Sequence, residues 1–491
     1  MSEVLERVTV STRTVPLSEA VEINPKPDRS LLSDNLDVSF VPMAMVEAGT
    51  GNIDATTVRK YAEVKKGYTY FRDGDVLFAK ITPCMENGKM VVARNLHNGI
   101  GFGSTEFHVL RSRESVDPHY VYHFVASSRF RAEAAHHMTG AVGQKRVPTS
   151  FLERAEIPLP PIEDQRRIVA EIEKQFSRLD EAVANLKRVK ANLKCYKAAV
   201  LKAAVEGRLV PTEAELARRE GRNYESGAQL LQRILETRRS QWDGKGKYKV
   251  PLALNTANRP ELPEGWASVT IEQLLSPTKE AMKTGPFGSL LKKHEHQSEG
   301  IAVLGIENIQ AMRFVRGSKI HITPQKAHDL EGYRVVPGDI LLSRSGTVGE
   351  VCVVPDNIGD ARISTNLIKV SLAKGGMLPE FFVLLFNGSP FVLNQVSDLC
   401  KGSTRDFLNQ EILKQLCFIL PPLAEQHRIV AEIDRRLSFV NEVESEVNAN
   451  LKRTQALRHA VLQAAFSGQS GQQTKDGKGT IMPVKEHLCA S

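Results

Sequence analysis

The chain has 491 residues, 41% hydrophobic and 25% charged, which is too long for one hydrophobic core and typical of a multidomain globular protein. The formal charge of +8 is compatible with a polyanionic partner but does not by itself indicate one. The first fifteen residues contain no apolar signal segment, and the most apolar short run, Phe381–Phe386, is far below the ~20 residues of a membrane span. The six cysteines form no CxxC pair, which argues against a zinc site. We therefore expect a cytoplasmic protein.

The first segment, residues 1–156, is expected to form a mixed α/β globule. Its Gly74-Asp75 dipeptide precedes the apolar run Val76–Phe78, a pattern typical of a turn followed by a buried strand. Near its end lies a glycine-rich basic turn, residues 140–146, which carries Lys145 and Arg146.

Residues 157–209 are expected to form one long helix. Pro160 and Pro161 prevent a helix upstream because proline lacks an N–H group and restricts the residue before it. Gly207 is expected to end the helix as a C-cap. Apolar residues recur at steps of three and four, which indicates the narrow seam of a coiled coil. Val189 and Tyr196 are two of the apolar residues in this pattern.

A connector follows at residues 210–261, with a short amphipathic helix predicted over Ser226–Trp242. Ser226 and Gln229 have the spacing of a capping box. The next segment, residues 262–417, is expected to form a second mixed α/β globule, because Gly338-Asp339 again precedes an apolar run and a basic turn at residues 401–405 again closes the segment.

Residues 418–468 repeat the first long helix without a gap. Pro421 and Pro422 align with the first proline pair, and the sequence RIVAEI occurs at residues 167–172 and again at residues 428–433. A repeat of this kind indicates two copies of one architecture. The tail, residues 469–491, is polar and is expected to be disordered.

Two such helices in one chain can cover each other's apolar seam, and each buried Leu or Val then contributes roughly 1.5–3 kcal/mol. The alternative is two separate helices, each packed on its own globule. The seven-residue spacing in the first helix favours the paired arrangement. In the second helix, Leu457 also belongs to the apolar pattern. The residues predicted to form the interface between the helices are Leu179, Leu186, Leu193, Val200, Val440, Val447 and Leu451.

Motifs of catalysis are weak in this sequence. Gly99–Gly103 has the glycines of a cofactor loop but no clear strand and helix around it, and Asn24–Pro27 lacks the aromatic residue of an adenine methylase motif, so both are interpreted as turns. There is no phosphate-binding loop for ATP, and the 13 histidines show no metal-ligand spacing.

The sequence resembles the specificity subunits of type I restriction-modification enzymes. The resemblance rests on the doubled LPPxxEQxRIVAEI-like element, the GDxL turns, and the segments Leu262–Trp266, Gly285–Ser289 and Lys401–Leu408. The first globule lacks a clear counterpart of Gly285–Ser289, so its contacts are less defined.

This resemblance implies two α/β target recognition domains, each reading one half of a split DNA sequence. It also implies that the two helices pack antiparallel, with pseudo-two-fold symmetry, and fix the spacing between the half-sites. Two methyltransferase subunits and two restriction subunits would be the protein partners. S-adenosylmethionine, ATP and magnesium would bind to those partners, and this chain would hold no cofactor, no metal and no catalytic residue.

On this reading, the basic residues of the shared motifs are candidates for DNA contact, while a solvated surface charge is the alternative for each one. A coiled-coil adaptor that joins proteins without touching DNA remains a second interpretation of the whole chain. The residues predicted to contact DNA are Lys145, Arg146, Lys283, Ser289, Arg344 and Arg405.

Overall fold

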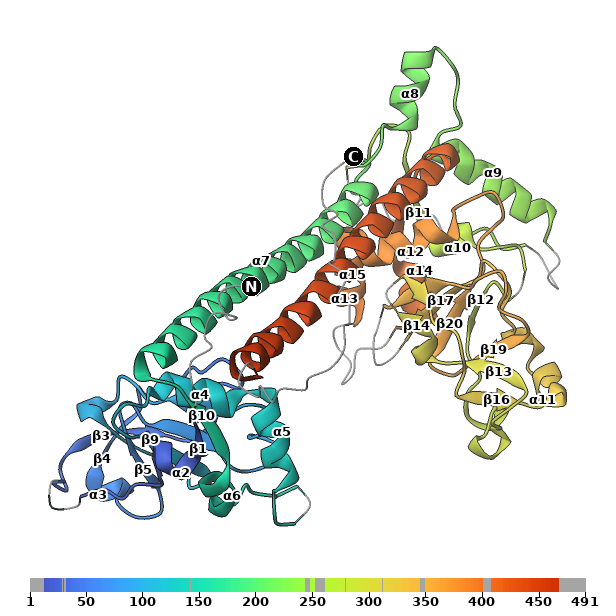
Figure 1. Cartoon of the computed structure of the whole chain (residues 1–491). Coiled ribbons are helices and arrows are strands. Elements are labelled where there is room, and N and C mark those ends of the chain that lie inside the picture. Colours follow the sequence, from blue (N-terminus) through green and yellow to red (C-terminus); the bar gives the residue numbers. More distant parts are fainter. Residues whose placement is uncertain are drawn as a thin grey trace, which may run out of the picture. The chain divides into compact units, whose positions relative to one another are not determined.

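The computed structural model describes residues 13–467 apart from residues 29, 31, 142, 243–247, 252–260, 279, 311, 345–348 and 401–407. The chain forms two compact units (Figure 1). Unit 1 comprises residues 1–187 and 448–491, and unit 2 comprises residues 188–447. Both boundaries fall inside the long helices α7 (Ile162–Val205) and α15 (Leu423–Ser467), so each unit includes a part of both helices. The predicted tail lies outside the described residues.

Unit 1 contains short helices and three small sheets. The sheets have the strand orders β2-β9-β6-β7, β4-β3-β8-β5 and β1-β10. The strands are β1 (Arg13–Pro16), β2 (Val21–Ile23), β3 (Asp37–Val41), β4 (Val58–Lys60), β5 (Thr69–Arg72), β6 (Val76–Ala79), β7 (Met90–Val92), β8 (Ile100–Gly103), β9 (Phe107–Ser112) and β10 (Glu156–Leu159). The helices before α7 are α2 (Leu17–Ala20), α3 (Tyr61–Val64), α4 (Pro118–Ala126), α5 (Ser128–His136) and α6 (Thr149–Arg154).

Unit 2 repeats this plan. Its strands are β11 (Ala267–Thr270), β12 (Met282–Thr284), β13 (Ile301–Leu304), β14 (Ile309–Gln310), β15 (Arg313–Phe314), β16 (Ile320–Ile322), β17 (Ile340–Ser343), β18 (Val351–Val353), β19 (Ala361–Ile363), β20 (Leu367–Val370) and β21 (Cys417–Leu420). Its helices, besides the long ones, are α8 (Glu213–Glu220), α9 (Gly227–Ser240), α10 (Ile271–Leu274), α11 (Pro324–Asp329), α12 (Pro379–Gly388), α13 (Pro390–Cys400) and α14 (Gln410–Gln415).

The two units share one topology. The sheet β2-β9-β6-β7 corresponds to β12-β20-β17-β18, and the hairpin β1-β10 corresponds to β11-β21. In the remaining sheet, β3 pairs parallel with β8 and antiparallel with β4, as β13 pairs parallel with β19 and antiparallel with β16. The prediction of two mixed α/β globules is therefore confirmed.

The Gly-Asp turns of the two units have the same structure. Gly74 and Gly338 have φ values of +89° and +82°, which favour glycine because it has no Cβ. In unit 1 the Asp75 carboxylate accepts the N–H of Arg72 at 2.8 Å. In unit 2 the Asp339 carboxylate accepts the N–H of Val336 at 2.9 Å. Each turn thus places the next residue at the start of a buried strand, as predicted.

The interpretation of Gly99–Gly103 as a turn is wrong. Residues 100–103 form the strand β8, which lies between β3 and β5. A Cβ atom on Gly101 would lie 2.2 Å from the ring of Phe71, and one on Gly103 would lie 2.2 Å from the carbonyl oxygen of Val41. The glycines therefore allow close packing within unit 1 and do not form a cofactor loop.

The helices begin and end at the proline and glycine signals, but the predicted segments 157–209 and 418–468 start in the strands β10 and β21, because the proline pairs prevent helix before Ile162 and Leu423. Both long helices begin directly after a proline pair. After α7, Gly207 adopts a φ of +68°, and the N–H of Arg208 donates to the carbonyl of Ala203 at 2.9 Å, as in a glycine C-cap. In the connector, the capping box of Ser226 and Gln229 is formed at the start of α9, so the short helix predicted there is confirmed.

Within unit 1, the first part of α7 contacts the last part of α15. Arg458 binds Asp180 through two hydrogen bonds of 2.8 and 3.0 Å, and its guanidinium carbon lies 4.5 Å from the ring centre of Phe176. Nearer the start of α7, Ile172 shares the hydrophobic core with Leu462. The contacted α15 residue number rises as the α7 residue number falls, so the two segments run in opposite directions.

Within unit 2, the last part of α7 contacts the first part of α15 in the same way. Lys197 donates to Glu444 at 2.7 Å and to Asn441 at 2.9 Å. Further along α7, Val200 shares the core with Ile433. These segments also run in opposite directions.

The predicted interface residues are all buried or half-buried. Val200, Val440 and Val447 are buried, and Leu179, Leu186, Leu193 and Leu451 are half-buried. Three other residues of the apolar pattern do not lie in the seam, because Val189, Tyr196 and Leu457 are 39%, 43% and 44% exposed. None of the seven predicted interface residues is exposed, whereas these three apolar positions face solvent.

One buried glutamine joins the start of each long helix to its unit. In unit 1, Gln165 donates to the carbonyls of Pro160 and Ser115 and accepts the N–H of Asp117, at 2.8 to 3.1 Å. In unit 2, Gln426 donates to the carbonyl of Pro421 at 2.9 Å and accepts the N–H of Leu378 at 2.8 Å. Asp117 and Leu378 are the N-cap residues of α4 and α12. The glutamine thus fixes the first turn of the long helix against the helix that follows the sheet.

The pH dependence of stability should differ between the units because of His123 in α4. This side chain is 4% exposed, and neither ring nitrogen has a hydrogen-bond partner among the described residues. Burial lowers its pKa to about 3. Between pH 6.5 and 3, His123 therefore binds a proton in the unfolded chain but not in the folded chain. As a result, the free energy of unfolding should fall by up to ~1.4 kcal/mol per unit of decreasing pH.

Urea unfolding of the chain between pH 4.5 and 7 measures this effect. The equivalent residue in unit 2 is Leu384, so His123→Leu should make the fall less steep. Some pH dependence should remain, since burial also lowers the pKa of His108. The exposed His136 gives the control, and His136→Leu should keep the original slope. Equal slopes for H123L and the wild type would contradict the interpretation.

Candidate nucleic-acid interface

The basic turn of unit 1 lies beside the end of β6. The N–H of Thr82 donates to the carbonyl of Lys145 at 3.0 Å, and the N–H of Val147 donates to the carbonyl of Lys80 at 2.9 Å. The structure thus brings Lys80 next to the predicted pair Lys145 and Arg146. Lys145 is exposed and can approach a phosphate group.

Arg146 has a structural partner. Its guanidinium binds the Glu106 carboxylate through two bonds of 2.8 and 2.9 Å, and these hydrogen bonds lower the pKa of Glu106. A bidentate pair of this kind holds the side chain in one geometry. Arg146 therefore fastens the turn, and Lys145 is the residue that the turn presents to solvent.

A hollow of about 280 Å³ lies in the same unit and combines lysines with aromatic rings. Lys65 binds Asp34 at 2.8 and 2.9 Å, while Lys26 is exposed and Lys80 half-buried. Lysines beside aromatic rings are the residues that contact phosphates and bases in nucleic-acid sites. The lining residues are Asn24, Pro25, Lys26, Pro27, Lys65, Tyr68, Thr69, Tyr70, Lys80, Phe102 and Phe107.

In unit 2, the structure brings together Lys283, the segment 285–289 and Arg344. Lys283 lies 5.2 Å from the ring centre of Tyr333 and donates to Glu280 at 3.2 Å. The guanidinium carbon of Arg344 lies 4.7 Å from the ring centre of Phe287, and its Nη1 donates to the carbonyl of Thr365 at 3.1 Å. Ser289 lies in a short 3-10 helix (Gly288–Leu290), and its side chain and Arg405 are outside what the structure describes.

The strand register shows which residues of the two units are equivalent. Ile23 lies opposite Leu110, and Met282 lies opposite Val370. Leu110 and Val370 in turn lie opposite the first residues of β6 and β17. Residues 24–28 of unit 1 are therefore the counterpart of residues 283–287 of unit 2, although they lack the Gly-Pro-Phe sequence.

Lys80 and Arg344 are a second equivalent pair. The N–H of Leu408 donates to the carbonyl of Arg344 at 3.1 Å, which repeats the bond of Val147 to Lys80. The sequence prediction missed Lys26 and Lys80. The available signal was the Gly-Asp turn, since both Lys80 and Arg344 follow its aspartate by the same interval.

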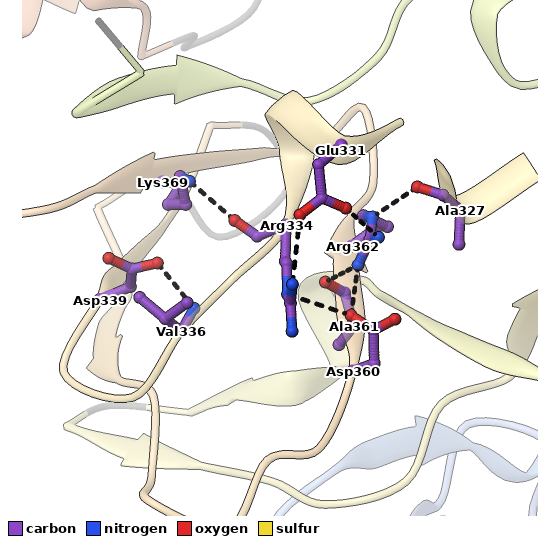
Figure 2. A network of polar contacts seen from close by, with 9 residues as sticks. All are labelled: Ala327, Glu331, Arg334, Val336, Asp339, Asp360, Ala361, Arg362 and Lys369. Atoms are coloured by element: carbon purple, nitrogen blue, oxygen red, sulfur yellow. Dashed lines mark hydrogen bonds and ion pairs between the residues drawn. The ribbon is translucent and has the colours of Figure 1, made fainter. Parts of the chain in front are cut away.

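A network of polar contacts joins Glu331, Asp360 and two arginines of unit 2 (Figure 2). The buried guanidinium of Arg362 binds Glu331 and Asp360, each at 2.6 Å, and donates to the carbonyl of Ala327 at 2.9 Å. Arg334 binds the same two carboxylates at 3.2 and 3.3 Å. Glu331 begins the 3-10 turn η8 (Glu331–Tyr333), so the network holds the ring of Tyr333 in place.

Lys369 and Asp339 extend this region of unit 2. The Lys369 ammonium donates to the carbonyl of Arg334 at 2.7 Å, and burial lowers the pKa of Lys369. Burial raises the pKa of Asp339, whose carboxylate accepts the hydroxyl of Ser371 at 2.5 Å. The Lys369 ammonium and the Asp339 carboxylate thus stabilise the backbone around the Gly-Asp turn of unit 2.

No three His, Cys, Asp or Glu side chains gather to hold a metal ion in the part of the chain that the structure describes. None of the described helices is both long enough and apolar enough to span a bilayer. What the two units do share is a basic and aromatic surface next to the equivalent turns.

The family model for the type I restriction modification DNA specificity domain matches residues 11–194 and 263–453. The chain belongs to this family. It is 27% identical over 503 residues to the type I restriction enzyme EcoEI specificity subunit of Escherichia coli, an alignment that covers 92% of this chain and 82% of the relative.

Solved structures share the fold of this specificity-domain chain. One, described as the structural basis underlying complex assembly and conformational transition of the type I R-M system, aligns with a TM-score of 0.66 at 19% identity and covers 93% of this chain and 97% of its own. The HsdS subunit from Thermoanaerobacter tengcongensis aligns with a TM-score of 0.54 at 20% identity and with the same coverage of both chains.

Replacing Arg362 should destabilise unit 2. Arg362→Met removes a buried cation that several acceptors share, and it should lower the free energy of unfolding by ~2–3 kcal/mol. Arg334→Met is the matched control in the same network. It should cost below ~1 kcal/mol because that side chain is half exposed and its ion pairs are screened by water. Urea denaturation measures both, and equal losses would contradict the central role of Arg362.

Proposed function

We propose that this chain is the non-catalytic, DNA-reading subunit of a type I restriction-modification enzyme. Units 1 and 2 would each read one half of a bipartite target. The observation that carries this proposal is the doubled fold, in which equivalent positions hold different side chains: Asp28 and Lys80 in unit 1, Phe287 and Arg344 in unit 2. A matched framework with different contact residues is what two different half-sites require.

We also propose that α7 and α15 form one antiparallel coiled coil with pseudo-two-fold symmetry, which sets the spacing between the half-sites. The matched contacts support this proposal. Arg458 with Asp180 in unit 1 occupies the positions equivalent to Lys197 with Asn441 in unit 2. We likewise propose the domain limits expected from the sequence, with target recognition domains at residues 1–156 and 262–417 and the helical segments at residues 157–209 and 418–468.

The protein partners would be two methyltransferase and two restriction subunits, which would carry S-adenosylmethionine, ATP and magnesium in the cytoplasm. An exposed stripe on the unit 2 part of α7 supports such docking. It consists of Val189, Tyr196 and Ala199, which are all exposed, and their steps of seven and three place them on one helix face. Within unit 2, Phe439 of α15 is also 64% exposed.

Lysine substitutions test the DNA surface of unit 1. Lys80→Ala and Lys145→Ala should each weaken binding of target DNA by the chain assembled with its methyltransferase subunits. Each should also reduce the slope of log K against log salt concentration by about one, because each lost phosphate contact releases fewer counterions. Fluorescence anisotropy at several salt concentrations measures both quantities.

Lys174→Ala is the control for this experiment, since Lys174 is an exposed residue of α7 in the same unit. Its salt slope should match that of the wild type. If the assembled wild-type chain shows no sequence-specific DNA binding, the adaptor interpretation replaces the proposal.

Substitution of the exposed stripe tests the docking surface. Val189→Asp places a charge in the stripe and should prevent copurification of the methyltransferase subunits, because an unpaired charge at an apolar interface is costly. The fold should be unaffected, since Val189 is exposed. Lys194→Asp introduces the same residue on another face of the helix and should leave assembly intact. Retained assembly in V189D would remove the stripe from the interface.

A further inference from the structure

Phe287 is a large apolar side chain that unit 2 holds out in solvent. It is 51% exposed, although the backbone around it is firmly held. The N–H of Gly285 donates to the carbonyl of Leu367 at 3.0 Å, and the Thr365 hydroxyl donates to the carbonyl of Pro286 at 2.6 Å. The exposed ring therefore stands on a backbone that hydrogen bonds hold in place.

The close approach at Gly285 shows how tightly this segment is seated. A Cβ atom at Gly285 would lie 1.9 Å from the carbonyl oxygen of Ser364. Gln410 also donates to the hydroxyl of Thr284, directly before the segment, at 2.8 Å. The backbone that carries Phe287 is therefore fixed before any partner binds.

The Arg344 side chain contacts the ring of Phe287 and is shielded from solvent. Its side chain is buried, and its guanidinium carbon lies 4.7 Å from the ring centre of Phe287, within the range of a cation–π contact. Burial lowers the pKa of Arg344. This residue was predicted to contact DNA, but its geometry fits a positioning residue for Phe287.

The surroundings of the ring fit a nucleic acid. Lys283 lies on the strand that leads into the same segment, and Arg344 begins the segment that follows β17. Apolar side chains at such surfaces contact the methyl group of thymine or insert between base pairs. In unit 1, the position equivalent to Phe287 is Asp28, so no aromatic ring stands there.

We propose that Phe287 is a specificity-determining residue that makes an apolar contact with the bases of the half-site read by unit 2, with Arg344 as its positioning residue. This inference rests on the proposed function, because it requires that unit 2 face DNA. In this proposal the Phe287 ring contacts the bases directly, and the Arg344 guanidinium acts only by holding that ring in position.

The experiment uses the chain assembled with its methyltransferase subunits and the target found by mapping methylated adenines in the host genome. Phe287→Ala should weaken binding of that target by about 5- to 100-fold and leave affinity for unrelated DNA unchanged. A set of targets with single base-pair changes should show lost discrimination at one or two adjacent positions of one half-site only. Phe287→Trp should restore most of the affinity because it keeps a flat ring.

Two further variants separate positioning from folding. Arg344→Lys should lose discrimination at the same positions, with no further loss when it is combined with Phe287→Ala. Ile306→Ala is the control, since Ile306 is an exposed apolar residue of unit 2, and it should bind as the wild type does. The melting temperature of F287A should stay unchanged.

Affinity and discrimination of F287A within twofold of the wild type would overturn the inference while leaving the proposed function in place. Absence of sequence-specific binding by the wild-type assembly would overturn the proposed function instead. Loss of discrimination in both half-sites would also overturn the inference, because the residue would then act on the assembly and not on one target unit.

Discussion

Each long helix depends on a buried glutamine in its first turn. Gln165 and Gln426 are fully buried, and each joins the helix to the segment that starts another helix of the same unit. Because a buried amide without partners is costly, this bond network permits one docking geometry. The remaining contacts of the helix, such as Ile172 with Leu462 in unit 1, follow from that start.

The helix ends complete the cores of the two units. The core of unit 1 includes the beginning of α7 and the end of α15, and the core of unit 2 includes the beginning of α15 and the end of α7. The two arrangements first considered for the helices, packing on each other or packing on a globule, are therefore both present within each unit. Seam residues such as Leu186 and Leu193 lie in the parts of α7 between those cores.

The sequence predicted the framework well and the contact residues less well. The helix limits and the turns before β6 and β17 could be predicted because proline, glycine and apolar spacing act locally. Lys80 follows the Gly-Asp turn by the same interval as Arg344, but its place beside Lys145 depends on hydrogen bonds between segments far apart in the chain, which the sequence does not show. Arg146 and Arg344 looked alike as basic residues near glycines, and only the structure shows Glu106 and Phe287 as their partners. As DNA contacts, Lys145, Arg146, Lys283, Ser289, Arg344 and Arg405 all stay predictions.

The glutamine bonds reach main-chain atoms only: the carbonyls of Pro160, Ser115 and Pro421 and the N–H groups of Asp117 and Leu378. Main-chain groups are the same in nearly every amino acid, so these bonds place no demand on the side chains of the segment that is held. The body of a unit can therefore change its sequence extensively and still seat on the same helix. A chain built in this way can acquire a new reading surface without redesigning its scaffold.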